Sequence, residues 1–507
     1  MKLEKEIIEN LIKEKASHPE DLERIKKRVA KKHRSSFPTN IKLLEVYHKM
    51  RGSDNRILSL LRTRPVRSLS GVVNISVLTK PFPCPGECMY CPEESSIPKS
   101  YLDGEPAVMR ALLNNYDPEK QVKMRISALE KAGHPTEKLE VRIVGGSWSS
   151  YPKKYKEEFV KRVFDACLSP RQKKSRTLKE AQKRNEKAKH RIVCLSVETR
   201  PDLVTHKEIE ELRTLGVTMV ELGVQSLFDD VLAFVKRGHK VEDTKKATKL
   251  LKDGGFKVCY QVMLNLPGST QKKDVETFKQ LFTRPDFRPD FLKIYPCVVV
   301  KSAPLYHLWK RGEYKPFSDQ QVTDIINTIK ENFIPRYVRI QRVFRDIPKQ
   351  NIVAGCKTSN LRELITARCE CIRCREVKGG YDPREAILLF REDYTASGDK
   401  EIFLTMESGD RKRLYALLRL RNIEKKEMGM IRELHTYGRQ ITTKEKNKDA
   451  PQHKGLGKKL VEAAEKITEK ELGKKKLAVI SGVGARDYWR SLGYRLEKTY
   501  MIKKINF

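Results

Sequence analysis

The chain has 507 residues and a formal net charge of +38, from 104 Lys and Arg against 66 Asp and Glu. The length suggests about three domains. The sequence contains no run of about 18 apolar residues, so no transmembrane helix is predicted. The charged start MKLEKEIIENLIKEK is unlike a signal peptide. We therefore expect a cytoplasmic protein without membrane association. The charge indicates a polyanionic partner, most simply nucleic acid, although an excess of lysine for general reasons such as life at high temperature stays open.

Residues 1–70 form a basic N-terminal segment. Apolar residues recur there at helical spacing and predict an amphipathic first helix: Leu3, Ile7, Ile8, Leu11 and Ile12. A dense run of Lys, Arg and His follows between positions 24 and 34. Such a run is often only a solvated helix face, but it indicates contact with RNA equally well.

Between residues 71 and 343, apolar runs alternate with helix-like stretches. The runs lie at 72–78, 141–144, 192–197, 219–224, 258–264 and 291–294. This alternation predicts an α/β fold with a parallel sheet, and the (β/α)6 repetition makes a partial TIM-like barrel. In parallel α/β folds the ligand binds at the carboxyl ends of the strands, so the residues that follow each strand are the candidates for a site.

The first predicted strand is followed directly by KPFPCPGECMYCP, which spaces Cys84, Cys88 and Cys91 as C-x3-C-x2-C. Thiolate sets of this kind hold iron–sulfur clusters, normally with four ligands, so three leave one iron open to a substrate or cofactor. A zinc loop that lacks its fourth ligand and plain reduced cysteines are the alternatives. The spacing, with Tyr90 before the third cysteine, resembles the cluster loop of the radical S-adenosylmethionine (SAM) enzymes.

Later strand ends carry further residues suited to a ligand. Gly145 and Gly146 follow the second strand, where a missing Cβ lets a backbone approach a ligand closely. In radical SAM enzymes a Gly-Gly pair at this place contacts the amino group of SAM. Glu198 ends the third strand and can accept from a ribose hydroxyl or an ammonium group, and Gln225 ends the fourth. Ordinary turn chemistry explains any one of these residues but not the whole set.

Two features lie outside this pattern. Residues 171–191 are rich in Lys and Arg and predict a polar basic insertion or helix, partly disordered in the absence of RNA. Cys369, Cys371 and Cys374 form a second set, in ARCECIRCREV, that predicts a structural zinc site stapling a linker at 351–382. Cys297 and Cys356 are candidates for its fourth ligand, and a second catalytic cluster is the alternative reading.

After residue 380 strands follow in close succession, at 386–390, 402–406, 414–420 and 430–437. The sequence QHKGLG at 452–457 then opens a helix at 458–472, and a strand follows at 477–480. A glycine-rich turn at a helix N-terminus presents free N–H groups to a pyrophosphate. The Q-x-x-G-x-G form after an antiparallel meander, with Tyr488 downstream, resembles the acetyl-CoA loop of the GNAT acetyltransferases.

Six stretches together make the chain resemble the catalytic subunit of Elongator, in an archaeal or bacterial type: KPFPCPGECMYCP, VRIVGGSW, LSVETRPD, MIRELHTYG, QHKGLGKKL and ISGVGARDYWRSLGYR. We expect a basic tRNA-binding segment at 1–70, a radical SAM domain at 71–350, the zinc linker at 351–382 and a mixed α/β GNAT-like domain at 383–507. The resemblance implies an enzyme that makes 5-carboxymethyluridine at the wobble position of tRNA from acetyl-CoA and SAM. Whether it works as a homodimer or with accessory subunits stays open.

The resemblance also assigns residues where the motifs match. Cys84, Cys88 and Cys91 would hold a 4Fe–4S cluster next to SAM. The acetyl-CoA contacts would be Lys138, Glu433, Leu434, His435, Thr436, Gly455, Leu456, Gly457 and Tyr488. Lys138 lies in the α/β part of the chain, so the thioester would bridge two domains, and Lys138 and Tyr488 are the expected catalytic residues.

The implied chemistry is radical addition. Reductive cleavage of SAM would give a radical that takes hydrogen from the acetyl methyl group, whose carbon then adds to C5 of the uridine. One alternative is a protein lysine acetyltransferase, with Tyr488 as the acid that protonates the CoA thiolate. The other is an RNA-binding scaffold whose cofactor sites are regulatory.

Overall fold

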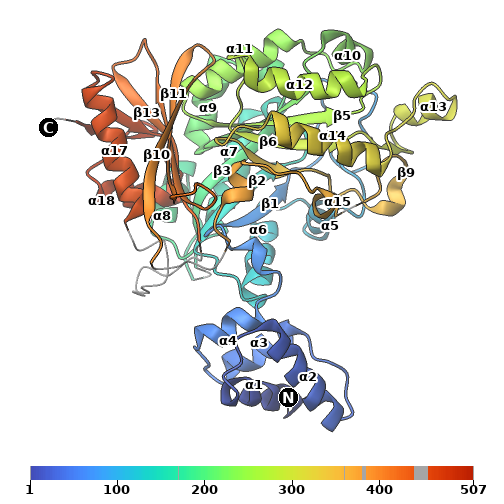
Figure 1. Ribbon diagram of the computed structural model, residues 1–507, viewed down its shortest axis with the longest axis vertical. Helices are drawn as coiled ribbons and strands as arrows, with labels where there is room; N and C mark the ends of the chain where they lie inside the picture. The colour runs from blue at the N-terminus through green and yellow to red at the C-terminus, as the bar shows by residue number, and fades with distance from the viewer. Residues whose placement is uncertain (1, 170, 359, 379–383, 439–454, 506–507) are drawn as a thin grey trace.

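The structure, a computed structural model, describes residues 2–169, 171–358, 360–378, 384–438 and 455–505. The chain forms an N-terminal helical lobe, a parallel half barrel and a C-terminal mixed sheet, and the lobe stands apart below the other two (Figure 1). No helix in these described ranges combines the length and the hydropathy that a bilayer crossing requires.

The N-terminal lobe consists of α1 (Lys2–Lys13), α2 (Pro19–Lys32), α3 (Asn40–Lys49) and α4 (Asn55–Leu61). Its own hydrophobic core contains Ile7, Ile8 and Leu11 of the predicted apolar stripe. Ile12 is 44% exposed, so the stripe is narrower than its spacing suggested.

The half barrel is a sheet of parallel strands in the order β1-β2-β3-β4-β5-β6-β8. Its strands are β1 (Val73–Leu78), β2 (Lys138–Val144), β3 (Arg191–Thr199), β4 (Met219–Gln225), β5 (Lys257–Leu264), β6 (Phe291–Pro296) and β8 (Arg339–Arg342). The predicted α/β class and partial barrel are confirmed, and β8 is an additional strand. With the sequence RIQR, β8 lacks the apolar run by which a buried strand is recognised.

The remaining elements of this part are short strands and the helices that connect the barrel strands. They are α5 (Pro106–Leu113), α6 (Pro118–Lys131), α7 (Lys153–Asp165), α8 (Leu178–Asn185), α9 (His206–Leu215), α10 (Asp229–Phe234), α11 (Val241–Asp253), α12 (Gln271–Thr283), β7 (Val299–Val300), α13 (Leu305–Lys310), α14 (Asp319–Asn332), β9 (Ile352–Ala354), α15 (Leu361–Leu364) and α16 (Ile372–Arg375).

The basic segment 171–191 is not a loose insertion, because α8 forms within it. Asn185 is fully buried at the end of that helix. Glu186, the next residue, pairs with Arg486 of the C-terminal domain at 3.0 Å. The expectation of partial disorder is therefore wrong, since the buried Asn185 and the pair of Glu186 with Arg486 anchor the segment to the rest of the chain.

The C-terminal sheet has the order β10-β11-β12-β13-β14-β16-β15. Its elements are β10 (Ile387–Ala396), β11 (Asp399–Ser408), β12 (Leu414–Asn422), β13 (Met428–Thr436), α17 (Leu456–Lys470), β14 (Lys476–Val479), α18 (Arg486–Ser491), β15 (Arg495–Glu497) and β16 (Tyr500–Lys504). β13 pairs with β14 in parallel, whereas the meander before it is antiparallel. Of the predicted turn, Gln452, His453 and Lys454 lie outside the described residues.

Buried ion pairs join the C-terminal sheet to the half barrel. Arg432 of β13 lies 2.6 Å from Asp290, just before β6, and 2.9 Å from Glu401 of β11. Arg421 of β12 lies 2.6 Å from Asp253 at the end of α11. Because pairs shielded from water hold a defined geometry, they fix the position of β13 against the amino-terminal end of the barrel.

Candidate active site

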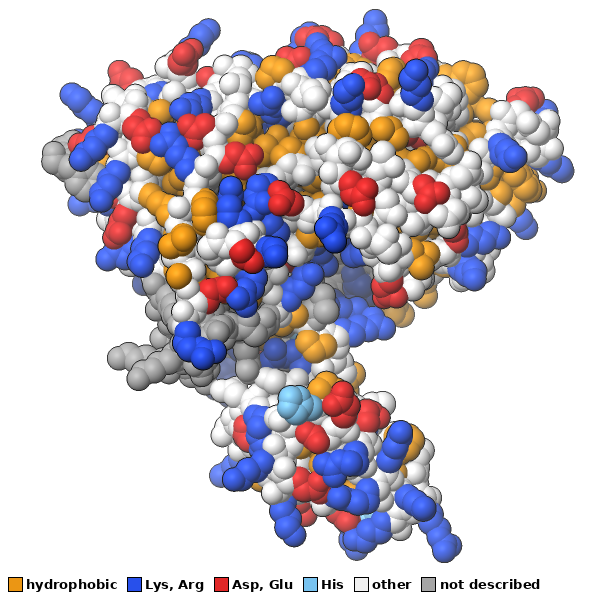
Figure 2. All heavy atoms as spheres, in the orientation of Figure 1, with side chains coloured by type: hydrophobic (Ala, Val, Ile, Leu, Met, Phe, Trp, Pro, Cys, Tyr) orange, Lys and Arg blue, Asp and Glu red, His pale blue; other side chains and the backbone are white. Residues whose placement is uncertain are grey.

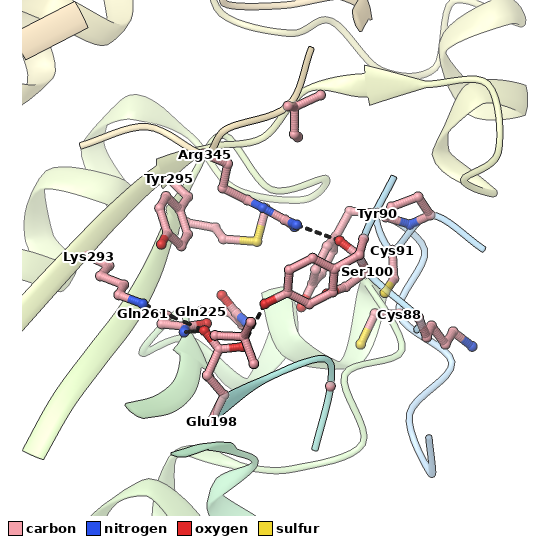
Figure 3. Close-up of a pocket in the computed structure, with 18 of the residues that line it drawn as sticks. Cys88, Tyr90, Cys91, Ser100, Glu198, Gln225, Gln261, Lys293, Tyr295 and Arg345 are labelled. Carbon is pink, nitrogen blue, oxygen red and sulfur yellow. Dashed lines mark hydrogen bonds and ion pairs between the residues drawn. The ribbon is translucent and has the colours of Figure 1, made fainter. Parts of the chain in front are cut away.

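The first of two large cavities, here the barrel cavity, has a volume of about 220 Å³ and lies at the carboxyl ends of the parallel strands (Figure 3). The predicted site residues that line it are Cys84, Cys88, Cys91, Gly146, Glu198 and Gln225. They come from the ends of β1 to β4 or the loops that follow. Parallel pairing puts these ends at one edge of the sheet, so residues far apart in sequence meet there.

The geometry of the cysteine loop fits a group larger than one metal ion. The sulfur atoms of Cys84, Cys88 and Cys91 do not all lie within 4.8 Å of one another. Thiolates on a single zinc ion, bound at about 2.3 Å, lie about 3.8 Å apart. Burial, with the neighbouring thiols Cys88 and Cys84, raises the pKa of Cys91 to about 12, so a thiolate there requires a cation beside it. A cluster whose irons each take one cysteine meets both conditions.

The two glycines after β2 have different surroundings. A Cβ atom on Gly145 would lie 2.2 Å from Oγ1 of Thr79, so this glycine permits packing within the protein. A Cβ atom on Gly146 would have no atom within 4 Å, and Gly146 lines the cavity. Both have positive φ. Only Gly146 therefore offers its backbone to a ligand in the barrel cavity.

Glu198 is oriented by three neighbours. Tyr101 donates to Oε2 at 2.9 Å. Gln261 donates to Oε1 at 3.0 Å, and Lys293 lies 3.6 Å from Oε1 (Figure 3). Burial raises the pKa of Glu198, and the positive charge of Lys293 opposes that shift. The carboxylate is thus held as an acceptor that faces the cavity.

Gln225 shows signs of a ligand-facing residue. Its φ is +69°, which is rare for a residue with a side chain. Its Oε1 atom is buried and has no hydrogen-bond partner in the structure. A donor on a bound ligand would satisfy this acceptor.

Sequence reasoning missed several residues of the barrel cavity. Gln261 and Lys293 belong to strands that otherwise read as apolar, and Arg237 donates to Sγ of Cys88 at 3.5 Å. A polar residue inside a buried strand run was the available signal, since such residues are retained where a charge or hydrogen bond is needed.

The second cavity, here the interdomain cavity, has a volume of about 850 Å³ between the half barrel and the C-terminal sheet. It brings together most of the predicted acetyl-CoA residues: Lys138, Glu433, Leu434, His435, Thr436, Gly455, Gly457 and Tyr488. Leu456 is not among them, because its side chain is buried in the C-terminal core. Lys138 enters from the start of β2, so both domains supply residues to this cavity.

Several contacts define the chemistry of the interdomain cavity. A Cβ atom on Gly457 would lie 3.1 Å from the hydroxyl of Tyr488 and 3.6 Å from Oγ1 of Thr436. Tyr488 is 41% exposed, and partial desolvation raises its pKa to about 12, so its hydroxyl stays protonated and can donate. Burial and the charge of Arg191 lower the pKa of Lys138.

The C-terminal end of β13 is held by contacts on both sides. Glu433 accepts from Nε of Arg419 at 2.8 Å, and Nε2 of His435 lies 2.9 Å from the carbonyl oxygen of Ser70. Burial lowers the pKa of His435. The segment that enters β1 is thereby joined to the predicted acetyl-CoA strand.

The two cavities have a common wall. Ser76 of β1, Arg142 of β2 and Arg342 of β8 line both of them. The barrel interior therefore connects the cysteine loop to the strand that carries Glu433.

The sulfur atoms of Cys369, Cys371 and Cys374 all lie within 4.8 Å of one another, with Cys371 and Cys374 3.6 Å apart. This spacing fits thiolate ligands of one zinc ion. Cys297 and Cys356 do not belong to the group, so the structure does not support either as the fourth ligand. Hydrogen bonds with Cys369 and Cys374 lower the pKa of Cys371, which favours a thiolate there.

The sequence profile of the ELP3 N-terminal domain matches residues 1–69, that of the radical SAM superfamily residues 83–281, and that of the radical SAM C-terminal domain residues 289–371. The chain is 43% identical over 538 residues to a tRNA uridine(34) acetyltransferase of Methanocaldococcus infernus, with 99% of each protein covered. It is 36% identical to Elongator complex protein 3 of Drosophila melanogaster, over 99% of this chain and 95% of that protein.

Among solved structures, the chain is similar to the archaeal Methanocaldococcus infernus Elp3 with an N-terminal deletion of residues 1–46. The TM-score is 0.75 at 42% sequence identity, and the match covers 86% of this chain and 100% of the other.

Proposed function

Because the chain belongs to the Elp3/tRNA uridine(34) acetyltransferase family of radical SAM proteins, we propose that it forms 5-carboxymethyluridine at the wobble position of tRNA from acetyl-CoA and SAM. The common wall of Ser76, Arg142 and Arg342 carries the proposal. A radical made in one cavity and an acetyl group held in the other must meet, and the barrel interior offers a route without a passage through bulk water.

In the barrel cavity the protein binds and orients. Cys84, Cys88 and Cys91 would hold the 4Fe–4S cluster, which together with SAM supplies a carbon-centred radical when bound. Glu198 accepts hydrogen bonds, and Gln225 offers its unpartnered oxygen. These fixed acceptors suit the hydroxyl and ammonium groups of SAM.

In the interdomain cavity the protein would present acetyl-CoA to the barrel. Gly455 is the N-cap of α17 and Gly457 lies in its first turn, where free N–H groups suit the pyrophosphate of CoA. Tyr488, protonated at neutral pH, can donate to the thioester oxygen or to the CoA sulfur. Lys138 would approach the same group from the barrel side.

Zinc at Cys369, Cys371 and Cys374 belongs to the same proposal as a structural ion. The site lies next to β8, because the N–H group of Ile372 donates to the carbonyl oxygen of Val338 at 2.9 Å. A metal there would hold the last barrel strand in place.

The test uses anaerobically reconstituted protein with tRNA, SAM, dithionite and acetyl-CoA, followed by digestion of the tRNA and mass spectrometry of the nucleosides. We expect 5-carboxymethyluridine and 5′-deoxyadenosine, each dependent on all components. Acetylated protein without modified uridine would indicate the lysine acetyltransferase instead. Tight tRNA binding without SAM cleavage would indicate the scaffold, and either outcome contradicts the proposal.

A further inference from the structure

The half barrel is open on one side, between its edge strands β1 and β8. These strands are the two ends of the sheet order and do not pair with each other in the described part of the chain. Ser76 of β1 and Arg342 of β8 nevertheless line the same two cavities. Both cavities therefore meet at this opening, and a group that enters it reaches their common wall.

Three arginines gather on the β1 side of the opening. Arg110 of α5 donates to the carbonyl oxygen of Ser76 at 3.1 Å, and its Nε atom is buried without a hydrogen-bond partner. Arg67, in the turn before β1, and Arg125 of α6 line the interdomain cavity. The three come from separate elements, so the fold assembles the cluster.

This arginine cluster, Arg67, Arg110 and Arg125, lacks a matching negative charge. No Asp or Glu in the described ranges lies within 4.0 Å of any of the three guanidinium groups. The nearby acid is Asp346, which already pairs with Arg342 at 2.6 Å. Burial, together with Arg67 and Arg110, lowers the pKa of Arg125 to about 10. Arg110 and Arg125 are partly buried and Arg67 is exposed beside them. Uncompensated cations in a partly buried place are stabilised by an anionic ligand.

The surface around the opening is also positively charged. Figure 2 shows Lys and Arg side chains gathered in the recess where the N-terminal lobe meets the rest of the molecule. The lobe attaches there, since Arg62 donates through Nε to the carbonyl oxygen of Gly133 at 2.8 Å, just after α6. A polyanion that follows this recess passes the arginine cluster.

We propose that the opening between β1 and β8 is the entry port for the substrate nucleotide, and that the arginine cluster binds a backbone phosphate beside the modified base. The inference rests on the proposed function, because it names how the RNA reaches that site. Guanidinium groups donate to phosphate oxygens in a bidentate way and position the RNA without reading its sequence. A phosphate held at the rim lets its base extend inward to Ser76 and Arg142, between the two cavities.

The phosphates of CoA have the same chemistry, and Arg67 and Arg125 line the cavity assigned to acetyl-CoA. We assign the cluster to RNA because Arg110 lies on α5, whose first residues Pro106 and Ala107 line the barrel cavity, away from the turn at Gly455. The experiment separates the two sources.

The experiment is a thermodynamic cycle on the full-length protein with an anticodon stem–loop RNA that carries uridine at the wobble position. For each phosphate that flanks this uridine, a separate RNA has a neutral methylphosphonate in its place. Affinities are measured for wild type, Arg125→Gln and Arg67→Gln, with Arg311→Gln as the control at an exposed arginine just after α13. Acetyl-CoA affinity is measured for the same proteins, and Arg125→Lys tests recovery by charge.

We expect Arg125→Gln to weaken binding of the unmodified RNA about tenfold, as for a charge-assisted hydrogen bond, and to lower the salt dependence by about 0.7 to 0.9 in log K against log salt. The methylphosphonate should weaken binding to wild type and Arg311→Gln by a similar factor but have little further effect on Arg125→Gln or Arg67→Gln. Acetyl-CoA affinity should stay unchanged, and Arg125→Lys should recover part of the RNA affinity.

Two results would overturn the proposal. If the fold-loss in affinity from the arginine variant and the fold-loss from the methylphosphonate multiply at every flanking phosphate, the cluster does not contact those phosphates. If acetyl-CoA affinity falls while RNA affinity and its salt dependence stay at the wild-type values, the cluster belongs to CoA. Failure of the proposed function is a separate result, seen as the absence of modified uridine with the wild-type protein, because these affinities are measured without turnover.

Discussion

At the scale of single residues, the site depends on side chains whose charge or hydrogen bonding is incomplete without a ligand. Gln225 keeps a buried oxygen without a donor, and the thiol of Cys91 has its pKa raised by burial. Such groups cost free energy in an apolar interior, so they are maintained where a ligand completes them.

Cys88→Ala should remove the brown colour of the reconstituted protein and SAM cleavage with it, because the loop supplies only three thiolates. Visible absorbance, iron content and 5′-deoxyadenosine are the measurements. Cys167→Ala, at a buried cysteine outside both cavities, is the control and should keep the colour. Full absorbance and turnover in Cys88→Ala would show that the cluster assignment is wrong.

His134 should make the protein less stable in mild acid. It is buried, its Nδ1 atom lies 2.9 Å from Oγ of Ser68, and burial together with the charge of Arg62 lowers its pKa to about 4. In the unfolded chain the His134 imidazole takes up a proton near pH 6.5, whereas in the folded protein it stays neutral down to about pH 4. The free energy of unfolding therefore falls as pH drops from 6.5 towards 4. The loss between pH 7 and pH 5 should be about 1–2 kcal/mol.

Urea unfolding of wild type and His134→Gln at pH 7 and pH 5 measures this effect. The variant should show a smaller change between the two pH values. His18→Gln, at an exposed histidine of the N-terminal lobe, should behave as wild type. An equal pH dependence in wild type and His134→Gln would contradict the assignment.

Among the secondary-structure elements, α16 and the cysteines in and just before it contact both the last barrel strand and the C-terminal sheet. Ile372 donates to Val338 before β8, and Arg375 pairs with Glu407 of β11 at 2.7 Å. A metal at Cys369, Cys371 and Cys374 would therefore tie the last barrel strand to the C-terminal sheet.

Cys374→Ser should reduce the zinc content from about one ion per chain to none and lower the midpoint of thermal unfolding, since metal binding contributes to folding. Metal analysis and calorimetry measure the two effects. Cys356→Ala tests one of the two candidates for a fourth ligand and should keep the zinc, because Cys356 lies outside the cysteine group. Zinc retained in Cys374→Ser and lost in Cys356→Ala would reverse the assignment.

At the scale of the whole molecule, the interface between the half barrel and the C-terminal sheet builds the interdomain cavity. Lys252 is fully buried there, and burial lowers its pKa to about 8 against the opposing charges of Asp290 and Glu401. The network has to be complete, since one unpaired charge inside it is costly.

Asp290→Asn should lower the free energy of unfolding by about 3–5 kcal/mol, because it removes one of the two buried carboxylates, Asp290 and Glu401, that face Arg432 and Lys252. Asp230→Asn, at an exposed pair with Lys273, should cost less than about 1 kcal/mol and is the control. The charges around Asp290, Arg432 first, hold its pKa well below 3.8, so its contribution is present above that pH and declines in acid. Equal losses in the two variants would contradict a structural function for the network.

Gly457→Glu and Lys138→Ala should each lower tRNA-dependent formation of 5′-deoxyadenosine, although neither residue lines the barrel cavity. A side chain at 457 meets Tyr488 at 3.1 Å, and its carboxylate repels the CoA phosphates. Lys459→Glu, an exposed change in the same helix turn, is the control. Cluster content and tRNA affinity should stay near wild type. SAM cleavage at the wild-type rate, with acetyl-CoA binding lost, would show that the two domains work independently.

The amino-acid sequence alone was enough to locate most elements of the barrel and to predict the chemistry of its loops, because local patterns carry that information. Apolar alternation placed the six predicted barrel strands, and the spacing of Cys84, Cys88 and Cys91 indicated the cluster. The same reasoning missed β8 and the folded structure of 171–191. The polar sequence of that segment is stabilised by distant partners such as Arg486, which pairs with Glu186. Periodicity cannot register such partners, since they depend on the completed fold.

Which residues share a cavity became clear from the folded chain and not from its sequence. Lys138 and Tyr488 are 350 positions apart in the chain, yet both line the interdomain cavity. Gly145 and Gly146 are equivalent in sequence, but only the second faces a ligand space. The arginine cluster comes from three elements whose sequences show ordinary surface arginines, and its missing counter-charge becomes visible only when the elements are packed. Burial and proximity produce these properties, and both arise from contacts between segments that are remote along the chain.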